Sequence, residues 1–162
     1  MRRIIALLGT VAALVALALS ATPTLAAVNF HGPAPTVGCQ NGTCTVTGFT
    51  VSGLGNDPLY EQLVVTSTYT ATCVNPAGNV APGQKPVAVT STSPPVGPTS
   101  AHNGTFTFAP LTYSPTAPNP ADYSAKQVGC PNNNWSVSAF TLTSQSATLQ
   151  LIRNGQVLYS QP

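Results

Sequence analysis

Charge is the first property that this sequence lacks. Only 5% of its residues are Asp, Glu, Lys or Arg, and the whole chain carries a net charge of +2. Two of its five basic residues are Arg2 and Arg3, and the chain without them is neutral. A neutral surface provides neither the basic patch that nucleic acids bind nor the polybasic cluster that anionic membranes attract. We therefore expect no nucleic-acid partner.

Catalytic signatures are also scarce. The only histidines are His31 and His102, neither has a recognisable neighbourhood, and no Gly-x-Ser-x-Gly elbow occurs. A serine hydrolase needs a base beside its nucleophile, and a glycosidase needs two carboxylates across a cleft. The only acidic residues are Asp57, which is expected to cap a turn, Glu61, expected at the exposed start of a strand, and Asp122, expected in a long loop. This pattern favours a protein that is not an enzyme and needs no cofactor.

The N-terminal segment has the organisation of an export signal. A short basic start precedes an apolar run at residues 4–19, and residues 20–27 are small and weakly polar. The run is too short to span a bilayer comfortably and has no stop-transfer flank. We interpret residues 1–26 as a helical signal peptide, with Ala26 or Ala27 as its last residue. Residues 27–162 then form a single secreted domain without a membrane anchor.

The cysteines support the same compartment. All four lie after the expected cleavage site, and an even number of cysteines in an exported chain implies disulfides. Cys39 and Cys44 flank an Asn-Gly turn, which suits a hairpin closed by its own bridge. That pairing leaves Cys73 to pair with Cys130. A zinc site is the competing interpretation, but the spacing contains no CxxC pair and neither histidine sits in a ligand motif.

Alternation of apolar and polar residues predicts strands. In residues 60–73 the apolar side chains fall on one phase and threonines dominate the other, which is typical of a half-buried antiparallel strand. Gly48 interrupts the phase of residues 45–54, so a bulge is expected there. Asn154-Gly155 between two apolar runs is the strongest hairpin signal. The residues expected in the core are Leu63, Val65, Tyr69, Phe106, Phe108, Leu149 and Leu151.

Seven or eight short strands of this kind are expected, with no amphipathic helix in the secreted domain. Two stacked antiparallel sheets bury such strands most simply, so the expected fold is an all-β, immunoglobulin-like sandwich. Trp135 lies beyond Cys130 in the sequence, unlike the tryptophan of antibody domains, which lies between the bridged cysteines. We expect Trp135 to pack against a Cys73–Cys130 bridge.

Two proline-rich loops are the expected contact surface, because loops on a rigid scaffold often carry function. They cover residues 93–104 and 110–129. Pro94, Pro95, Tyr113 and Tyr123 are the candidate contact residues within them.

Three blocks of sequence carry a resemblance. They are Gly-Leu-Gly-Asn at residues 53–56, Thr-Cys-x-Asn-Pro-x-Gly-Asn-x-x-Pro-Gly-Gln at residues 72–84, and Gly-Cys-Pro-Asn-Asn-Asn-Trp at residues 129–135. Together they resemble small secreted proteins of unknown function from actinobacteria such as streptomycetes. The resemblance implies a secreted β protein, and it transfers no functional residue.

These observations lead to one main functional hypothesis. We expect a non-catalytic extracellular binding or interaction module whose partner is a protein, a glycan or a small ligand. A secreted proteinase inhibitor and a carrier for a small apolar ligand are the alternatives. An unrecognised hydrolase is the least favoured class.

Overall fold

The structure is a computed structural model, and it describes residues 28–162. The expected signal peptide and its cleavage site lie outside the described residues. Strands β1 to β6 comprise Asn29–Phe30, Val37–Gln40, Thr43–Val46, Phe49–Ser52, Tyr60–Val74 and Val80–Pro82. Strands β7 to β12 comprise Val87–Thr92, Ser100–His102, Thr105–Phe108, Leu111–Tyr113, Ser136–Arg153 and Gln156–Gln161. A 3-10 turn, η1 (Pro120–Asp122), and a one-turn helix, α1 (Ala125–Val128), lie between β10 and β11.

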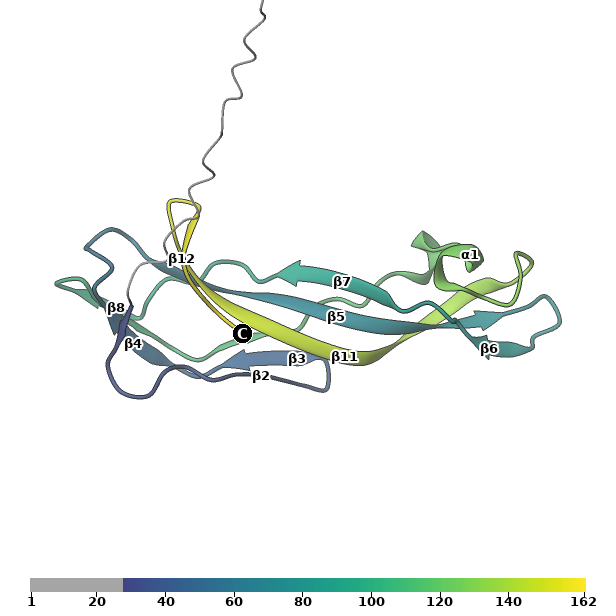
Figure 1. Cartoon of the computed structure of the whole chain (residues 1–162), viewed down its shortest axis with the longest axis horizontal. Helices are drawn as coiled ribbons and strands as arrows, with labels where there is room; N and C mark the ends of the chain where they lie inside the picture. Colours follow the sequence, from purple (N-terminus) through teal and green to yellow (C-terminus); the bar gives the residue numbers. More distant parts are fainter. Residues whose placement is uncertain (1–27) are drawn as a thin grey trace, which may run out of the picture.

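Two long strands form the spine of the molecule. β5 has 15 residues and β11 has 18, and they pair in antiparallel fashion along the full length of β5 (Figure 1). β12 extends this sheet beside β11, while β6 and β7 pair with the other side of β5. The predicted all-β antiparallel sandwich is confirmed. The described chain has more strands than expected, because several of them are only two to four residues long.

The second layer consists of two smaller sheets. Their strand orders are β1-β4-β9-β8 and β10-β3-β2. The chain passes from one sheet to the other at Gly48, between β3 and β4, so the bulge expected there is instead a break between strands. A Cβ atom at Gly48 would lie 3.0 Å from the carbonyl oxygen of Phe108. This close approach explains why a glycine marks the crossing.

Three hairpins use the same Asn-Gly turn. Asn41, Asn103 and Asn154 all have positive φ angles, of 50°, 48° and 50°, and each is followed by a glycine with positive φ. Asparagine tolerates this left-handed conformation and glycine adopts it without strain, so the pair forms the tight turn that matches the twist of antiparallel strands. The hairpin predicted at Asn154-Gly155 is confirmed, since it joins β11 to β12.

The main core lies where the second layer covers the spine. β5 alternates there between buried and partly exposed side chains, and its buried phase includes Leu63 and Val65. Phe49 and Phe108 stack with ring centroids 5.0 Å apart. The seven side chains predicted to be core are all buried, although Tyr69 lies outside the main cluster.

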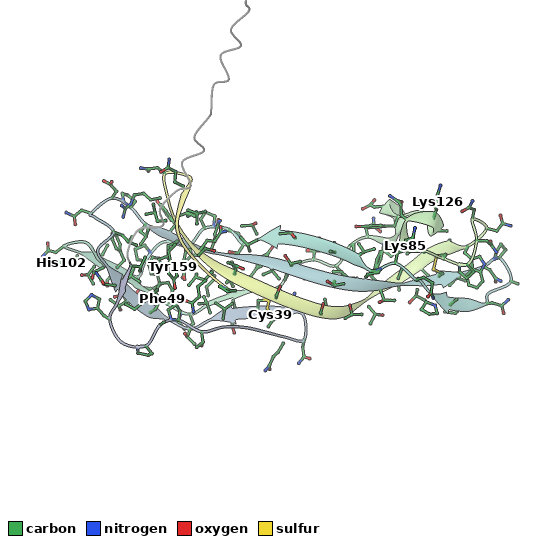
Figure 2. The ribbon with its side chains drawn as sticks, viewed as in Figure 1. Cys39, Phe49, Lys85, His102, Lys126 and Tyr159 are labelled. Atoms are coloured by element: carbon green, nitrogen blue, oxygen red, sulfur yellow. A yellow bond between two sulfur atoms is a disulfide. The ribbon has the colours of Figure 1, made fainter. Side chains whose placement is uncertain are left out.

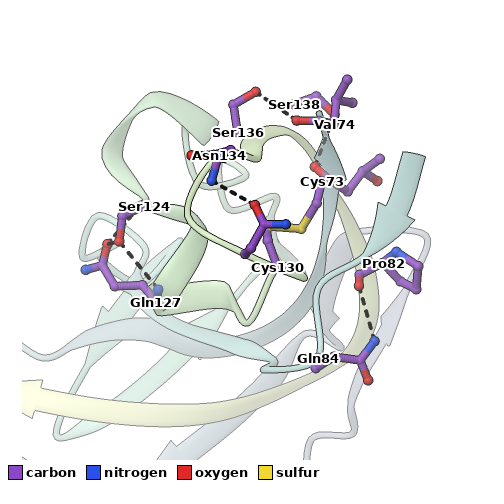
Figure 3. The surroundings of a disulfide bond; sticks show 12 residues. Cys73, Val74, Pro82, Gln84, Ser124, Gln127, Cys130, Asn134, Ser136 and Ser138 are labelled. Carbon is purple, nitrogen blue, oxygen red and sulfur yellow. Dashed lines mark hydrogen bonds between the residues drawn. A yellow bond between two sulfur atoms is a disulfide. The ribbon is translucent and has the colours of Figure 1, made fainter. Parts of the chain in front are cut away.

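A smaller cluster holds the other end of the spine. Its fully buried members are Ala71, Cys73 and Val128, and Trp135 and Cys130 pack against them. The Cys73–Cys130 disulfide joins β5 to the segment after α1 (Figure 3). Both the predicted disulfide pairing and the predicted position of Trp135 near this bridge are therefore confirmed.

Helix α1 is short but well capped. The Ser124 hydroxyl accepts a hydrogen bond from the Gln127 backbone N–H, and the Gln127 side chain accepts one from the Ser124 N–H. This reciprocal arrangement is a capping box, and it satisfies donors that a four-residue helix would leave free. Gly129 ends the helix with a φ of 72°. The cap fixes the segment that delivers Cys130 to Cys73 (Figure 3).

Candidate hairpin groove

The β2–β3 hairpin is constrained by both a turn and a disulfide. Its two strands are joined by the Asn41-Gly42 turn, and Cys39 and Cys44 face each other across the ladder and form the second disulfide. This bridge also confirms the pairing predicted from the sequence. The hairpin lies beside the middle of β11, where Cys39 is placed in Figure 2. A doubly constrained hairpin presents its side chains from a rigid frame, which favours binding.

Two hollows adjoin this hairpin. The larger, of about 610 Å³, lies over Gly38, Gln40 and Thr45. The smaller, of about 260 Å³, lies between the hairpin tip and β11. They share Cys39, Gln40 and Asn41, so we treat them as one feature, the hairpin groove. Its lining residues are Gly38, Cys39, Gln40, Asn41, Gly42, Thr43, Thr45, Leu142, Thr143, Ser144 and Gln145.

Gly38 opens the larger hollow. It pairs directly with Thr45 across the hairpin, and a Cβ atom built on it would meet no heavy atom within 4 Å. Its backbone is not in the left-handed region, so other residues can occupy the position without backbone strain. The missing side chain therefore leaves space on the outer face of the hairpin.

Residues of β11 form the opposite wall of the smaller hollow. The register between β5 and β11 shifts between Leu142 and Ser144, which makes Thr143 a bulged residue. The Thr143 hydroxyl donates a hydrogen bond of 2.9 Å to the Thr68 carbonyl oxygen. Bulges turn side chains away from the regular alternation of a strand. The bulge at Thr143 therefore interrupts the regular alternation of β11 beside the hairpin tip.

Gln145 lines the smaller hollow and also carries a buried, unpaired acceptor atom. Its Nε2 donates to the hydroxyl oxygen of Ser67 at 3.0 Å, and Ser67 is only 1% exposed. The Gln145 Oε1 atom is buried and has no hydrogen-bond partner among residues 28–162. Buried polar atoms are nearly always hydrogen-bonded in native proteins, so this oxygen is an exception within the protein interior.

A separate apolar hollow lies at the tip of the sandwich. It has a volume of about 300 Å³, and Pro58, Tyr60, Pro98 and Phe106 are among its lining residues. Tyr60 is 41% exposed and its ring lies 3.8 Å from the position of a Cβ atom on Gly97. The size is at the lower limit for a small-molecule site.

The predicted contact prolines lie on an anchored loop. Pro94 and Pro95 are both exposed. Before them, Ser93 is buried, accepts a hydrogen bond of 3.0 Å from the Leu63 N–H and donates its own N–H to the Leu63 carbonyl oxygen. After them, Val96 exchanges two backbone hydrogen bonds of 2.8 Å with Glu61. The two prolines therefore project from a loop that is fixed at both ends.

The two predicted contact tyrosines pack against the protein instead of projecting from it. Tyr113 lies in β10, pairs with Cys44 and is half-buried against the main core. Tyr123 is half-buried against the smaller cluster, with its ring edge-on to Phe140 at 5.1 Å. The rings expected on an exposed surface thus contribute mainly to packing, because the proline-rich segment folds back over the sheet.

Glu61 does not occupy the exposed position expected for it. It lies on the buried phase of β5, opposite Leu151 of β11, and is only 1% exposed. Burial raises the pKa of Glu61 to about 7. Asp57 and Asp122 are exposed, and Asp122 belongs to η1. Glu61 is therefore not paired with Asp57 or Asp122 across a cleft.

The remaining ionisable groups are dispersed. Figure 2 places His102 at one tip of the molecule and Lys85 and Lys126 at the other. His31 contacts the Ser52 hydroxyl at 2.8 Å through its Nε2 atom. Within residues 28–162, no group of three or more His, Cys, Asp or Glu side chains is placed to hold a metal ion. In the same part of the chain, no helix is long and apolar enough to cross a membrane.

Comparisons with protein-family models, with curated proteins and with solved structures found no match. The site must therefore be assessed from its own geometry. Sequence reasoning identified the disulfide and the turn of the hairpin but missed Gly38 and Gln145 as groove residues. The smaller hollow, which Gln145 lines, has no local signal, because it arises only when β11 folds beside the hairpin.

Proposed function

We propose that this protein is a non-catalytic extracellular binding module that holds its ligand in the hairpin groove. The observation that carries the proposal is the position of two contiguous hollows around a hairpin constrained by both a disulfide and an Asn-Gly turn. A rigid frame loses little conformational entropy when it binds. Two disulfides fit an oxidising compartment, in agreement with the expected export.

The lining of the groove supports binding more than catalysis. It consists of amide, hydroxyl, glycine, leucine and disulfide-bonded cysteine side chains. None of these is a general base or an activated nucleophile by itself, because amides do not titrate and a hydroxyl needs a neighbouring base. Such side chains recognise a ligand through hydrogen bonds and shape.

A groove-filling substitution tests this proposal. Gly38→Val places a branched side chain in the larger hollow at a strand position that accepts it. Ala88→Val is the matched control, since Ala88 is an exposed residue of β7 outside the groove. Immobilised wild type, Gly38→Val and Ala88→Val proteins are incubated with culture medium and envelope fractions of the producing cells.

The proposal predicts that wild type and Ala88→Val retain the same material and that Gly38→Val loses it. Equal retention by all three proteins would exclude the groove as the binding site. Circular dichroism and thermal denaturation establish that Gly38→Val is folded, so a loss of retention cannot be attributed to unfolding.

A proteinase inhibitor is the second candidate, and the Pro94–Pro95 loop favours it. Inhibitory loops are held rigidly at both ends while their middle is exposed, and this loop is fixed at Ser93 and Val96. An assay against secreted serine and cysteine proteases tests it. Inhibition that is lost in a Pro94→Gly, Pro95→Gly variant and kept in Gly38→Val would favour this candidate over the groove.

A further inference from the structure

We propose that two copies of this protein pair edge to edge through β7 and form a dimer with one continuous antiparallel sheet. The contact is independent of the hairpin groove, because β5 separates β7 from β11, the strand that borders the groove. Three features support it. They are the open backbone edge of β7, the absence of the usual protection of such an edge, and the neutral charge of the folded chain.

The register of β7 shows which of its backbone groups are free. The Ser93 N–H donates to the Leu63 carbonyl oxygen at 2.8 Å, so these two residues form a hydrogen-bonded pair. The β5–β7 register continues from this pair without a shift. Pairs along an antiparallel ladder alternate between hydrogen-bonded and non-hydrogen-bonded. The N–H and C=O groups of Ala88, Thr90 and Thr92 therefore point away from β5.

No second strand covers this edge. Within residues 28–162, β7 pairs only with β5, and Figure 1 shows it on the outer side of that strand. Val87 and Val89 of β7 are only half-buried. The β5 residues opposite them, Tyr69 and Ser67, are both buried. A further strand beside β7 would satisfy the free backbone groups and cover the two valines.

β7 also lacks the features that usually protect an edge strand. Proteins keep such strands short, or place a charge, a proline or a bulge in them. β7 has six residues, none of them charged or proline, and its register is regular. The outer strands β1, β2, β6, β8 and β10 have only two to four residues. β12 also has six, but its Gln161 side chain donates a hydrogen bond of 3.0 Å to the Pro35 carbonyl oxygen, so the chain before β2 lies against it.

The open edge is bounded at both ends. Before β7, the Lys85 N–H donates to the Val128 carbonyl oxygen at 3.0 Å. After β7, Pro94 and Pro95 have no N–H group to offer. The edge therefore accepts one short strand of about the length of β7.

A second copy of β7 fits this edge. With a twofold axis at Thr90, Thr90 pairs with Thr90 of the other copy, and Ala88 pairs with Thr92. All outward backbone groups of both strands then find partners, in about six hydrogen bonds. Pairs of threonines across antiparallel strands are favourable. Because the same edge is used by both copies, the contact closes on itself and gives a dimer instead of a fibre.

The charge of the chain permits this contact. Residues 28–162 contain three of the five basic residues and all three acidic ones, so their net charge is zero. A net charge near zero removes the repulsion that keeps copies of a protein apart. No charged side chain lies in β7, so no like charges meet across the contact.

An extended peptide of another protein is the competing occupant. Peptides that add a strand to a sheet gain specificity from pockets for their alternate side chains. The hollows at the hairpin and at the tip of the sandwich contain no residue of β7. The edge thus offers backbone hydrogen bonds without pockets, which favours a second copy.

Sedimentation equilibrium of the protein, prepared with both disulfides, tests the dimer. One strand edge is smaller than a standard interface, so we expect a monomer–dimer equilibrium with a Kd above about 1 µM. Samples between about 10 µM and about 1 mM cover this range. Hydrogen exchange at both limits should show that the amides of Ala88, Thr90 and Thr92 are protected only at the high concentration.

Charges placed at Thr90 test the twofold axis. Thr90→Glu and Thr90→Lys each bring two like charges together, and each should raise the Kd about fivefold. An equal mixture of the two variants should associate more tightly than either alone, because opposite charges then meet. Thr141→Glu and Thr141→Lys are the matched controls, at an exposed threonine of β11. Both should dimerise like the wild type.

Four results would overturn the proposal. The first is a monomer up to about 1 mM with rapid exchange at Ala88, Thr90 and Thr92, which would leave the edge to another partner. The second is a mass that rises beyond two copies, which would indicate open aggregation. The third is an equal effect of charges at Thr90 and Thr141. The fourth is a mixture of Thr90 variants that associates no better than each alone.

The dimer and the hairpin groove can fail separately. Gly38→Val leaves β7 unchanged and should dimerise like the wild type. Ala88→Val keeps every backbone group of β7, and its side chain lies on an exposed strand face that accepts β-branched residues. It should therefore dimerise as well and remains a valid control for the groove. Circular dichroism of the Thr90 variants establishes that they are folded, and the wild-type measurements decide the proposal if they are not.

Discussion

The two ends of the β5–β11 spine bury their inner faces by different means. At the first, which we call the sandwich end, residues 60–65 of β5 and 147–152 of β11 are covered by two further sheets. At the second, the disulfide end, residues 69–74 and 136–142 are covered by η1, α1 and their flanking segments. The β5–β11 pair is thus packed against two sheets at the sandwich end and against a few short segments at the disulfide end.

The two ends differ in how many side chains they bury. The main cluster contains thirteen buried residues, including three phenylalanines, whereas the smaller cluster contains three. Burial of an aliphatic side chain contributes roughly 1.5–3 kcal/mol, so three buried residues of which one is alanine supply little. The Cys73–Cys130 bridge lies within the smaller cluster. It stabilises the end at which burial alone is weak.

Removal of the Cys73–Cys130 bridge should have the largest effect. In the chain-entropy model a loop of 57 residues contributes roughly 4 kcal/mol, whereas the five-residue separation of Cys39 and Cys44 contributes about 2 kcal/mol. The double variant Cys73→Ala, Cys130→Ala should therefore lose about twice as much free energy of unfolding as Cys39→Ala, Cys44→Ala. Denaturant titration of both variants measures this. Equal losses would mean that the disulfide end does not depend on its bridge.

Truncation of the main core should have the next largest effect. Leu63→Ala removes a fully buried side chain at the sandwich end, which costs about 2–5 kcal/mol. Thr68→Ser is the control on the outer phase of the same strand, and it should be nearly neutral. The two denaturation midpoints provide the comparison. Equal shifts would show that the inner and outer phases of β5 are wrongly assigned.

The pH dependence of stability should reveal Glu61. The unfolded chain releases this proton near the ordinary value of 4.5, but the folded chain keeps it until pH about 7. The contribution of Glu61 to the free energy of unfolding is therefore fully present below pH 4.5. It is lost as the pH rises from 4.5 to about 7, and the loss is roughly 3 kcal/mol at most.

Glu61→Gln removes the titrating group while keeping its shape. Thermal denaturation of both proteins between pH 4 and 8 should show a decline in the wild type that is smaller in the variant. Parallel curves for the two proteins would mean that Glu61 does not titrate with a raised pKa. Asp57→Asn, at an exposed carboxyl, serves as the control and should follow the wild type.

Much of this fold could be predicted from local signals. Alternating apolar residues identified β5 and its buried phase, and the Asn-Gly pairs identified hairpin turns. The disulfides followed from the turn between Cys39 and Cys44 and from the remaining pair. These features depend on near neighbours in the chain, which explains why they were visible.

The errors share a cause. Glu61 was expected on an exposed phase at the start of a strand, but it stands on the same phase as Leu63 and is buried. Carboxylates are rarely buried. Tertiary packing overrode that preference. Gly48 was assigned to a bulge because the apolar phase changes there. Its close approach to Phe108 could not be predicted, because it depends on a strand far along the chain. The smaller hollow was missed for the same reason, because residues 142–145 of β11 lie beside the hairpin tip only in the folded chain.

Hydrogen exchange tests the contrast between the two ends most directly. Amide protection is measured along β5 and β11 in the wild type and in the double variant Cys73→Ala, Cys130→Ala. The account predicts that residues 69–74 and 136–142 lose protection in the variant by local opening, while residues 61–65 and 147–151 lose much less. An equal loss of protection at both ends would contradict it, because the spine would then unfold as a single unit.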